Sequence, residues 1–168
     1  LAAFAHAISH VTVAQTVARS GGPINVMPSH ATLELDIRTL PGVDDDDVDA
    51  AITEALGDLS EHVTIERLLS EAATASSTDT DLYRAIEAAL RRRYPGASVV
   101  PVLFPGGSDL RVARRRGGIG YGFGAVDSGA SLGQVYSQLH AHDEHIALAD
   151  VRATVEVLHE VATTYLGA

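Results

Sequence analysis

The chain has 168 residues, of which 46% are hydrophobic, so it can bury a core as one domain or as two small ones. Its formal net charge of -10 argues against nonspecific binding to the phosphate backbone of nucleic acids. Because cysteine is absent, disulfides, thiolate metal ligands and cysteine nucleophiles are excluded.

Targeting signals are absent from the printed sequence. No apolar run approaches the roughly 20 residues that span a bilayer, and no basic segment followed by an apolar one opens the chain. We therefore expect no membrane partner and, by default, a cytoplasmic location. The first residue is Leu rather than Met, which indicates a processed or truncated chain or a fragment.

The first half predicts a small sheet with helices. Residues 1–8 are Ala-rich and predict the end of a helix, while residues 11–19, 31–39 and 62–69 predict strands from β-branched residues or apolar alternation. The acidic run 44–47 predicts the start of a helix, and Gly57 is expected to end that helix. A calcium loop is the alternative for this run, but the alternating oxygen ligands and the bidentate Glu are missing.

The second half follows a small polar linker, residues 72–80, and predicts alternating helices and buried strands. Apolar runs at 98–103 and 118–123 predict buried strands. Helices are predicted from a cap at Asp79, after the turn 105–109, and from residue 149 or 150 to the C-terminal end. The expected inward side chains are Leu82, Ile86, Ala89 and Leu90 in the first of these helices and Val151, Val155, Leu158 and Val161 in the last.

Histidines and carboxylates crowd the segment 140–145, which reads His-Ala-His-Asp-Glu-His. Neutral imidazole is the commonest side-chain metal ligand, and carboxylates often orient it. The pattern therefore indicates a metal-binding loop before the last helix. A solvated polar loop is the alternative, and the cluster alone does not decide between them.

Arg91–Arg93 are interpreted as a solvated helix end rather than an anion site.

Four segments in order resemble the C-terminal part of the zinc-dependent aminoacylase/carboxypeptidase family, which includes acetylornithine deacetylase, succinyl-diaminopimelate desuccinylase and glutamate carboxypeptidase. They are Gly-Gly-Pro-Ile-Asn-Val-Met-Pro at 21–28, Leu-Asp-Ile-Arg-Thr-Leu-Pro-Gly at 35–42, Pro-Gly-Gly-Ser-Asp at 105–109, and His-Ala-His-Asp-Glu at 140–144. The Tyr-Gly-Phe-Gly run at 121–124 also matches. The resemblance covers nearly the whole chain.

The resemblance implies an α/β fold in two parts. Residues 1–70 would be most of a ferredoxin-like α+β lid domain, which in the family often forms a homodimer. Residues 71–168 would be the C-terminal part of the α/β catalytic domain of a zinc peptidase. The implied activity is metal-dependent hydrolysis of amide bonds in N-acyl amino acids or small peptides by a metal-activated water.

The resemblance also implies roles for individual residues. His140 would be a ligand in a site of two Zn²⁺ ions, with Co²⁺ or Mn²⁺ as alternatives. Asn25 and Arg38 would bind the substrate carboxylate, for which the planar donors of Arg are suited. Gly107 and Ser108 would line the substrate pocket, where Ser replaces the family's usual Thr and keeps the hydroxyl.

The chain departs from the family pattern because it has no His-x-Asp motif and no Glu-Glu pair, the family's other metal ligands. We therefore expect a C-terminal fragment that lacks the catalytic Glu and is inactive alone. Two alternatives stay open. One is a non-catalytic dimerisation or binding module. The other is an unrelated metal-binding protein that uses His140, His142 and His145 together.

Overall fold

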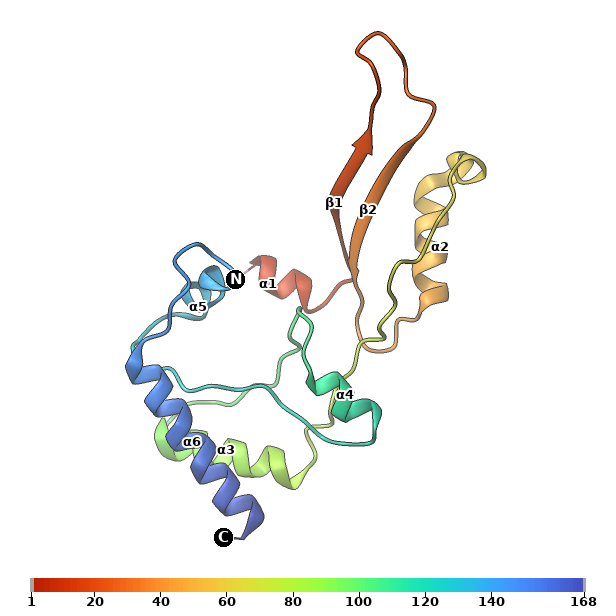
Figure 1. The fold of residues 1–168 in the computed structure, drawn as a ribbon. Helices are drawn as coiled ribbons and strands as arrows, with labels where there is room; N and C mark the ends of the chain where they lie inside the picture. Colours follow the sequence, from red (N-terminus) through yellow and green to blue (C-terminus); the bar gives the residue numbers. More distant parts are fainter. Residues whose placement is uncertain (1, 168) are drawn as a thin grey trace. The chain divides into compact units, whose positions relative to one another are not determined.

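The computed structural model describes residues 2–167 as a mixture of helices and a small β-sheet (Figure 1), which agrees with the expected α/β class. The described chain divides into two compact units. We call residues 2–75 with 103–111 the hairpin unit, and residues 76–102 with 112–167 the helical unit. The expected helix end at 1–8 is confirmed as α1, Ala2–Ala7, whereas Leu1 lies outside the described residues.

The hairpin unit contains two antiparallel strands, as predicted: β1, Thr12–Ser20, and β2, Ala31–Arg38. The pairing runs from Thr12 opposite Arg38 to Ser20 opposite Ala31, with an irregularity between Gln15 and Val17. Since Gln15 lies opposite Leu35 but Val17 lies opposite Glu34, the extra residue moves Val17 to the other face of the sheet. The sheet therefore has a bulge that simple alternation does not reveal.

Helix α2, Asp45–Leu56, begins at the predicted acidic run because Asp44 caps it. The Asp44 carboxylate accepts from the backbone N–H groups of Asp46 and Asp47, each at 3.0 Å, and the Asp47 carboxylate accepts from the Asp44 N–H at 3.1 Å. This reciprocal arrangement satisfies donors that a helix start leaves without partners. A short 3-10 helix, η1, Gly57–His62, follows.

The predicted strand at 62–69 is wrong. Among residues 2–167 the sheet has only β1 and β2, so this segment has no ladder of hydrogen bonds. It is held to α2 by side chains instead: Arg67 pairs with Asp45 and Asp49, each at 2.5 Å, and the Ser70 hydroxyl donates to Asp45 at 2.8 Å. A strand requires a partner, which the alternating pattern alone does not supply.

The core of the helical unit lies between α3, Asp81–Arg93, and α6, Leu148–Leu166. All four predicted residues of α3 contribute, since Ile86 and Ala89 are buried and Leu82 and Leu90 pack against the core. Thr80, however, caps the helix in place of Asp79 through a 3.1 Å hydrogen bond from the Tyr83 N–H. The predicted face of α6 is largely wrong. The buried residues of these two helices are Ala85, Ile86, Ala89, Asp150, Ala153, Val157 and Val161.

Two short helices, α4, Leu110–Arg115, and α5, Leu132–Gln138, complete the described elements. The predicted strands at 98–103 and 118–123 are also wrong, since neither segment finds a neighbouring strand within residues 2–167. Tyr121 and Phe123 nevertheless pack against the α3–α6 core. No helix between residues 2 and 167 combines the length and apolar character needed to cross a bilayer.

Candidate functional site

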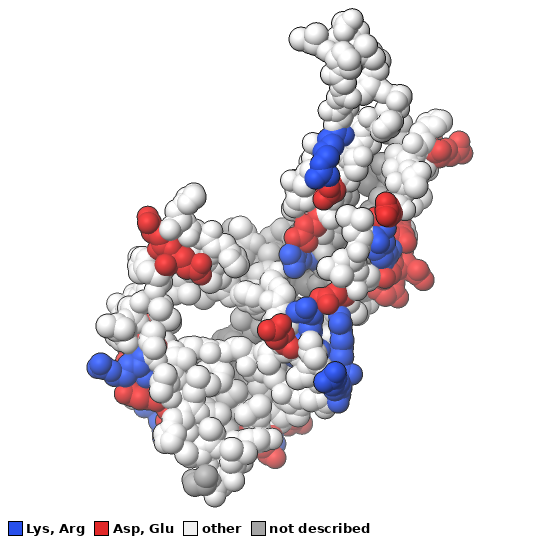
Figure 2. Space-filling model, in the orientation of Figure 1, with Lys and Arg blue, Asp and Glu red and all other residues white. Residues whose placement is uncertain are grey.

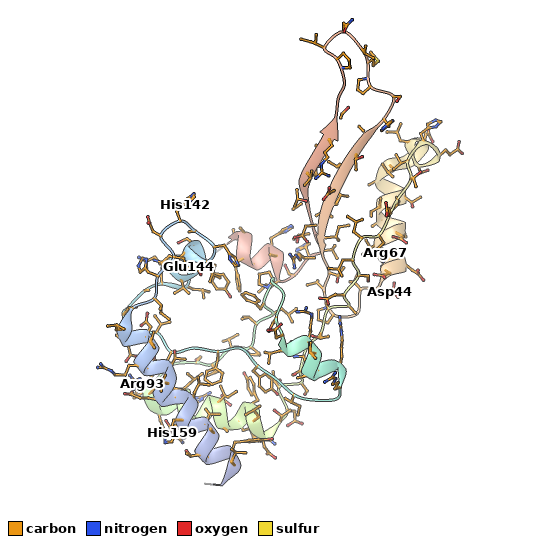
Figure 3. The ribbon with its side chains drawn as sticks, viewed as in Figure 1. Asp44, Arg67, Arg93, His142, Glu144 and His159 are labelled. Atoms are coloured by element: carbon orange, nitrogen blue, oxygen red, sulfur yellow. The ribbon has the colours of Figure 1, made fainter. Side chains whose placement is uncertain are left out.

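The histidine-rich segment lies in the loop between α5 and α6, where Figure 3 labels His142 and Glu144. Its start is fixed by α5, which Ser131 and Gln134 cap reciprocally. The Ala141 N–H then donates to the Gln138 carbonyl at 3.0 Å. The side chains from 140 to 145 are all exposed, and the acidic ones show at the surface in Figure 2. The loop is therefore both ordered by local hydrogen bonds and accessible.

His140 has an uncommon backbone conformation. Its φ of 60° is the only positive value among the non-glycine residues of the described chain. Such values are sparsely populated for residues with a Cβ, and His is among the types that tolerate them. The Glu144 carboxylate stabilises this conformation by accepting from the His140 N–H at 3.2 Å. An outlier held by its neighbours motivates a functional hypothesis for this residue.

His145 has a different role in the same loop. Its Nδ1 lies 2.6 Å from the Asp143 carbonyl, which can only accept, so we assign the proton to Nδ1. Its Nε2 then accepts from the side-chain amide of Gln138 at 3.3 Å. Both ring nitrogens are thus engaged within the loop, which disfavours the alternative in which His140, His142 and His145 share one metal ion.

The described residues form no cluster of the size that a zinc site requires. Across residues 2–167, no three side chains of His, Asp or Glu come together as a metal site. Structural zinc takes four protein ligands, and catalytic zinc takes three with water in the open position. The described residues therefore do not form a complete zinc centre.

Asp150 anchors the chain that leads into the loop. This buried carboxylate accepts from the Asp127 N–H, the Ser128 N–H and the Ser128 hydroxyl, each at 2.7 Å. The hydrogen bonds from Ser128 lower the pKa of Asp150, with that from Asp127 adding to them and burial opposing them. Sequence reasoning placed Asp150 only at the helix start. Its position in the first turn of α6 was the available signal.

Asp127 is held in turn by the end of α3. Arg93 forms an ion pair with Asp127, and its other terminal nitrogen lies 2.5 Å from Glu156. The Tyr94 hydroxyl donates to Asp127 at 2.8 Å. Arg93 first and Tyr94 second lower the pKa of Asp127. Arg91 and Arg92 are likewise paired, with Glu87 and Glu160, so the three arginines stabilise the surface of the helical unit rather than forming an open anion site.

Gly107 and Ser108 lie in the turn before α4, within the hairpin unit. The Ser108 hydroxyl accepts from the Leu110 N–H at 3.3 Å, and its carbonyl accepts from the Arg111 N–H at 3.1 Å. Gly107 is exposed, and a Cβ placed on it would meet nothing within 4 Å. In this turn the backbone of Gly107 is exposed, whereas the Ser108 hydroxyl already accepts a hydrogen bond at the start of α4.

Asn25 and Arg38 are separated by the whole of β2. Asn25 lies in the exposed turn that the Val26 N–H closes onto the Pro23 carbonyl at 2.9 Å, within the loop beyond the far ends of the strands (Figure 1). Arg38 ends β2 at the other side and pairs with Asp36 at 2.7 Å. Seven residue steps at about 3.3 Å make β2 roughly 23 Å long. The structure therefore does not bring these two residues together within one hairpin.

The comparison with protein families gives one match. The model of the family described as peptidase family M20/M25/M40 matches residues 3–164. No curated protein and no solved structure matches the chain. The matched range contains all five residues that sequence reasoning selected, namely Asn25, Arg38, Gly107, Ser108 and His140.

Proposed function

The chain belongs to peptidase family M20/M25/M40, and from that membership we propose that it serves the metal-dependent hydrolysis of amide bonds in N-acyl amino acids or small peptides. The observation that carries the proposal is the match over residues 3–164, which includes the His-Ala-His-Asp-Glu segment at 140–144. The match supports a hydrolase of this family. The amide substrate and the roles below are our proposal.

We assign His140 as one ligand of the metal, with Zn²⁺ as the first choice and Co²⁺ or Mn²⁺ as alternatives. Three features support this role: its exposed ring, its left-handed backbone and the hydrogen bond that Glu144 accepts from its N–H. Because no group of three or more potential ligand side chains forms within residues 2–167, we propose that the remaining ligands lie outside this loop.

On the substrate side, we assign the carboxylate of the substrate to Arg38. Its guanidinium is about half exposed and retains donors beyond the one paired with Asp36. Because the length of β2 separates Asn25 from Arg38, Asn25 makes a separate contact, and Gly107 and Ser108 line the pocket. We further propose that residues 1–70 act as the lid and that two copies associate through it, with residues 71–168 belonging to the catalytic domain.

The test is hydrolysis of a panel of N-acyl amino acids and small peptides, with and without added Zn²⁺, by the full gene product and by the 168-residue chain in parallel. The informative variant is His140→Asn, because Asn removes the imidazole yet tolerates a positive φ. The matched control is His142→Asn in the same exposed loop. A thermal melt of each variant separates loss of ligand from loss of fold.

We expect metal-dependent turnover by the full gene product, at least a hundredfold loss in His140→Asn and little change in His142→Asn. Equal loss in both variants would contradict the assignment of His140 as the ligand. No metal-dependent turnover by the full gene product would overturn the hydrolase proposal. The second candidate, a non-catalytic dimerisation module, would then replace the hydrolase proposal. The absence of a complete ligand set among the described residues favours this candidate.

A further inference from the structure

Two histidines outside the loop at 140–145 stack on each other after α1. The ring centroids of His6 and His10 are 4.5 Å apart, and the ring planes differ by 19°. Helical hydrogen bonds continue past Ala7, since the His10 N–H donates to the His6 carbonyl at 3.0 Å. The two side chains are therefore one turn apart on the same face, and both are exposed.

Ser9 fixes the proton position on His10. The Ser9 hydroxyl donates its single proton to the Ala5 carbonyl, 2.7 Å away. Its oxygen also lies 2.8 Å from His10 Nδ1, so we assign the proton of this contact to that nitrogen. The lone pair of His10 is consequently on Nε2. Metal-binding histidines are commonly oriented in this way, with the second ring nitrogen donating to a fixed acceptor.

We propose that His6 and His10 form a two-imidazole site for a divalent transition-metal cation such as Zn²⁺, Ni²⁺ or Cu²⁺. With metal–nitrogen distances of about 2.0–2.1 Å, two imidazoles in neighbouring coordination positions have ring centroids roughly 4.5–5 Å apart. The observed separation is at the short end of that range. Chelation then requires only a rotation of the exposed rings out of their stack, and water completes the coordination.

The hairpin unit contains a natural comparison for this site. The Ser29 hydroxyl lies 3.0 Å from His30 Nδ1, which repeats the Ser–His contact between neighbours in the sequence. His30 has no ring stacked on it among the described residues and no histidine four positions before it. A substitution of His30 therefore removes an exposed imidazole with a similar neighbour but without the second ligand.

The experiment is a Zn²⁺ titration of the whole, tag-free chain, labelled with ¹⁵N in the histidine rings and followed by NMR at neutral pH. We expect His10 to have the Nδ1–H tautomer before metal is added. We also expect the Nε2 signals of His6 and His10 to shift together at one midpoint. His6→Ala and His10→Ala should each weaken binding at the remaining ring at least tenfold, and Ser9→Ala up to about tenfold.

His30→Ala should leave the midpoint of the His6 and His10 signals unchanged. Independent midpoints for the two rings, unchanged binding at one ring after loss of the other, or an Nε2–H tautomer of His10 would each overturn the proposal. The readout is metal binding at named rings and not turnover. The proposed site at His6 and His10 is therefore tested independently of the hydrolase proposal and of the ligand role of His140.

Discussion

The carboxylate of Asp150 in α6 accepts two hydrogen bonds from Ser128, one from the backbone N–H and one from the hydroxyl, each at 2.7 Å. With the bond from the Asp127 N–H, these contacts attach α6 to the segment that leads into α5 and the histidine loop. They stabilise the ionised carboxylate, which is why the pKa of Asp150 is below its ordinary value of 3.8.

Asp150→Asn should lower the midpoint of thermal unfolding at neutral pH, because an amide accepts these three hydrogen bonds less well. A carboxylate with a depressed folded-state pKa contributes stability that is present above the ordinary pKa and lost as the pH falls through the folded-state pKa. The variant should therefore show a flatter loss of stability below about pH 4 than the wild type. Thermal melts across an acid series measure both effects, and Asp58→Asn, at an exposed position, is the control.

Val157→Ala should destabilise the helical unit by about 1.5–3 kcal/mol, since it removes two buried methyl groups and leaves a cavity. Val157 is 1% exposed in the α3–α6 core, whereas Val155 on the same helix is 59% exposed. The same substitution at Val155 should change the free energy of unfolding by less than about 0.5 kcal/mol. Urea unfolding of the pair measures the difference, and equal effects would show that the buried face of α6 is assigned wrongly.

Asp44→Ala should reduce stability by about 0.5–2 kcal/mol, because α2 would lose the acceptor of two backbone N–H groups. Asn is as good an N-cap residue as Asp, so Asp44→Asn should stay close to the wild type. Chemical unfolding followed by circular dichroism compares the two variants. A large loss in Asp44→Asn would mean that charge, and not the capping geometry, stabilises this helix start.

Gly118→Ala should destabilise the turn after α4. An added Cβ would lie 2.9 Å from the backbone carbonyl oxygen of Ala113, which already accepts from the Gly118 N–H and cannot easily move away. We expect a cost of about 1–3 kcal/mol, as for overpacking elsewhere. Gly122→Ala meets nothing within 4 Å and is the matched control. Similar unfolding midpoints for the two variants would contradict this close approach.

Arg38→Lys should raise the KM of the full gene product for N-acyl amino acids by at least about tenfold, because Lys cannot reproduce the planar donors that match a carboxylate. Arg19→Lys is the control, since Arg19 also lies on the hairpin and pairs with an acidic neighbour, Glu34. Steady-state kinetics separates KM from kcat. A fall in kcat with an unchanged KM would argue against a role for Arg38 in binding the substrate.

Local signals in the sequence were sufficient for the hairpin and for most helix starts. The alternation of β2, the acidic start of α2 and the apolar spacing of α3 each depend on residues within one or two turns. The capping pair Ser131 and Gln134 is an equally local signal for α5, which is not among the predicted helices.

Features that depend on distant residues were not predictable from such signals. The segments 62–69, 98–103 and 118–123 have strand composition, but a strand exists only where another segment pairs with it. Helix α6 has two apolar stripes, and the buried one contains Ala153, which is fully buried in the core shared with α3. Hydrophobicity alone favoured the larger residues of the other stripe, which remain largely exposed.

In the candidate site, the sequence indicated that residues 140–145 matter but not how they are arranged. The positive φ of His140 and the engagement of both His145 nitrogens depend on hydrogen bonds to Glu144, Asp143 and Gln138. The separation of Asn25 from Arg38 follows from the strand predicted at 31–39, although the resemblance assigns both residues to the same substrate carboxylate.

The hairpin unit consists of two stretches, residues 2–75 and 103–111, and residues 76–102 of the helical unit lie between them in the sequence. Arg111 of the second stretch pairs with Glu71 of the first at 2.8 Å. During synthesis on the ribosome, this unit cannot acquire its last contacts until residue 111 has emerged, although its two strands are made much earlier. Any single cleavage between residues 76 and 102 would also leave residues 2–75 and residues 103–111 of the hairpin unit on different fragments. The two units are therefore linked in their order of folding, and neither corresponds to one continuous stretch of the chain.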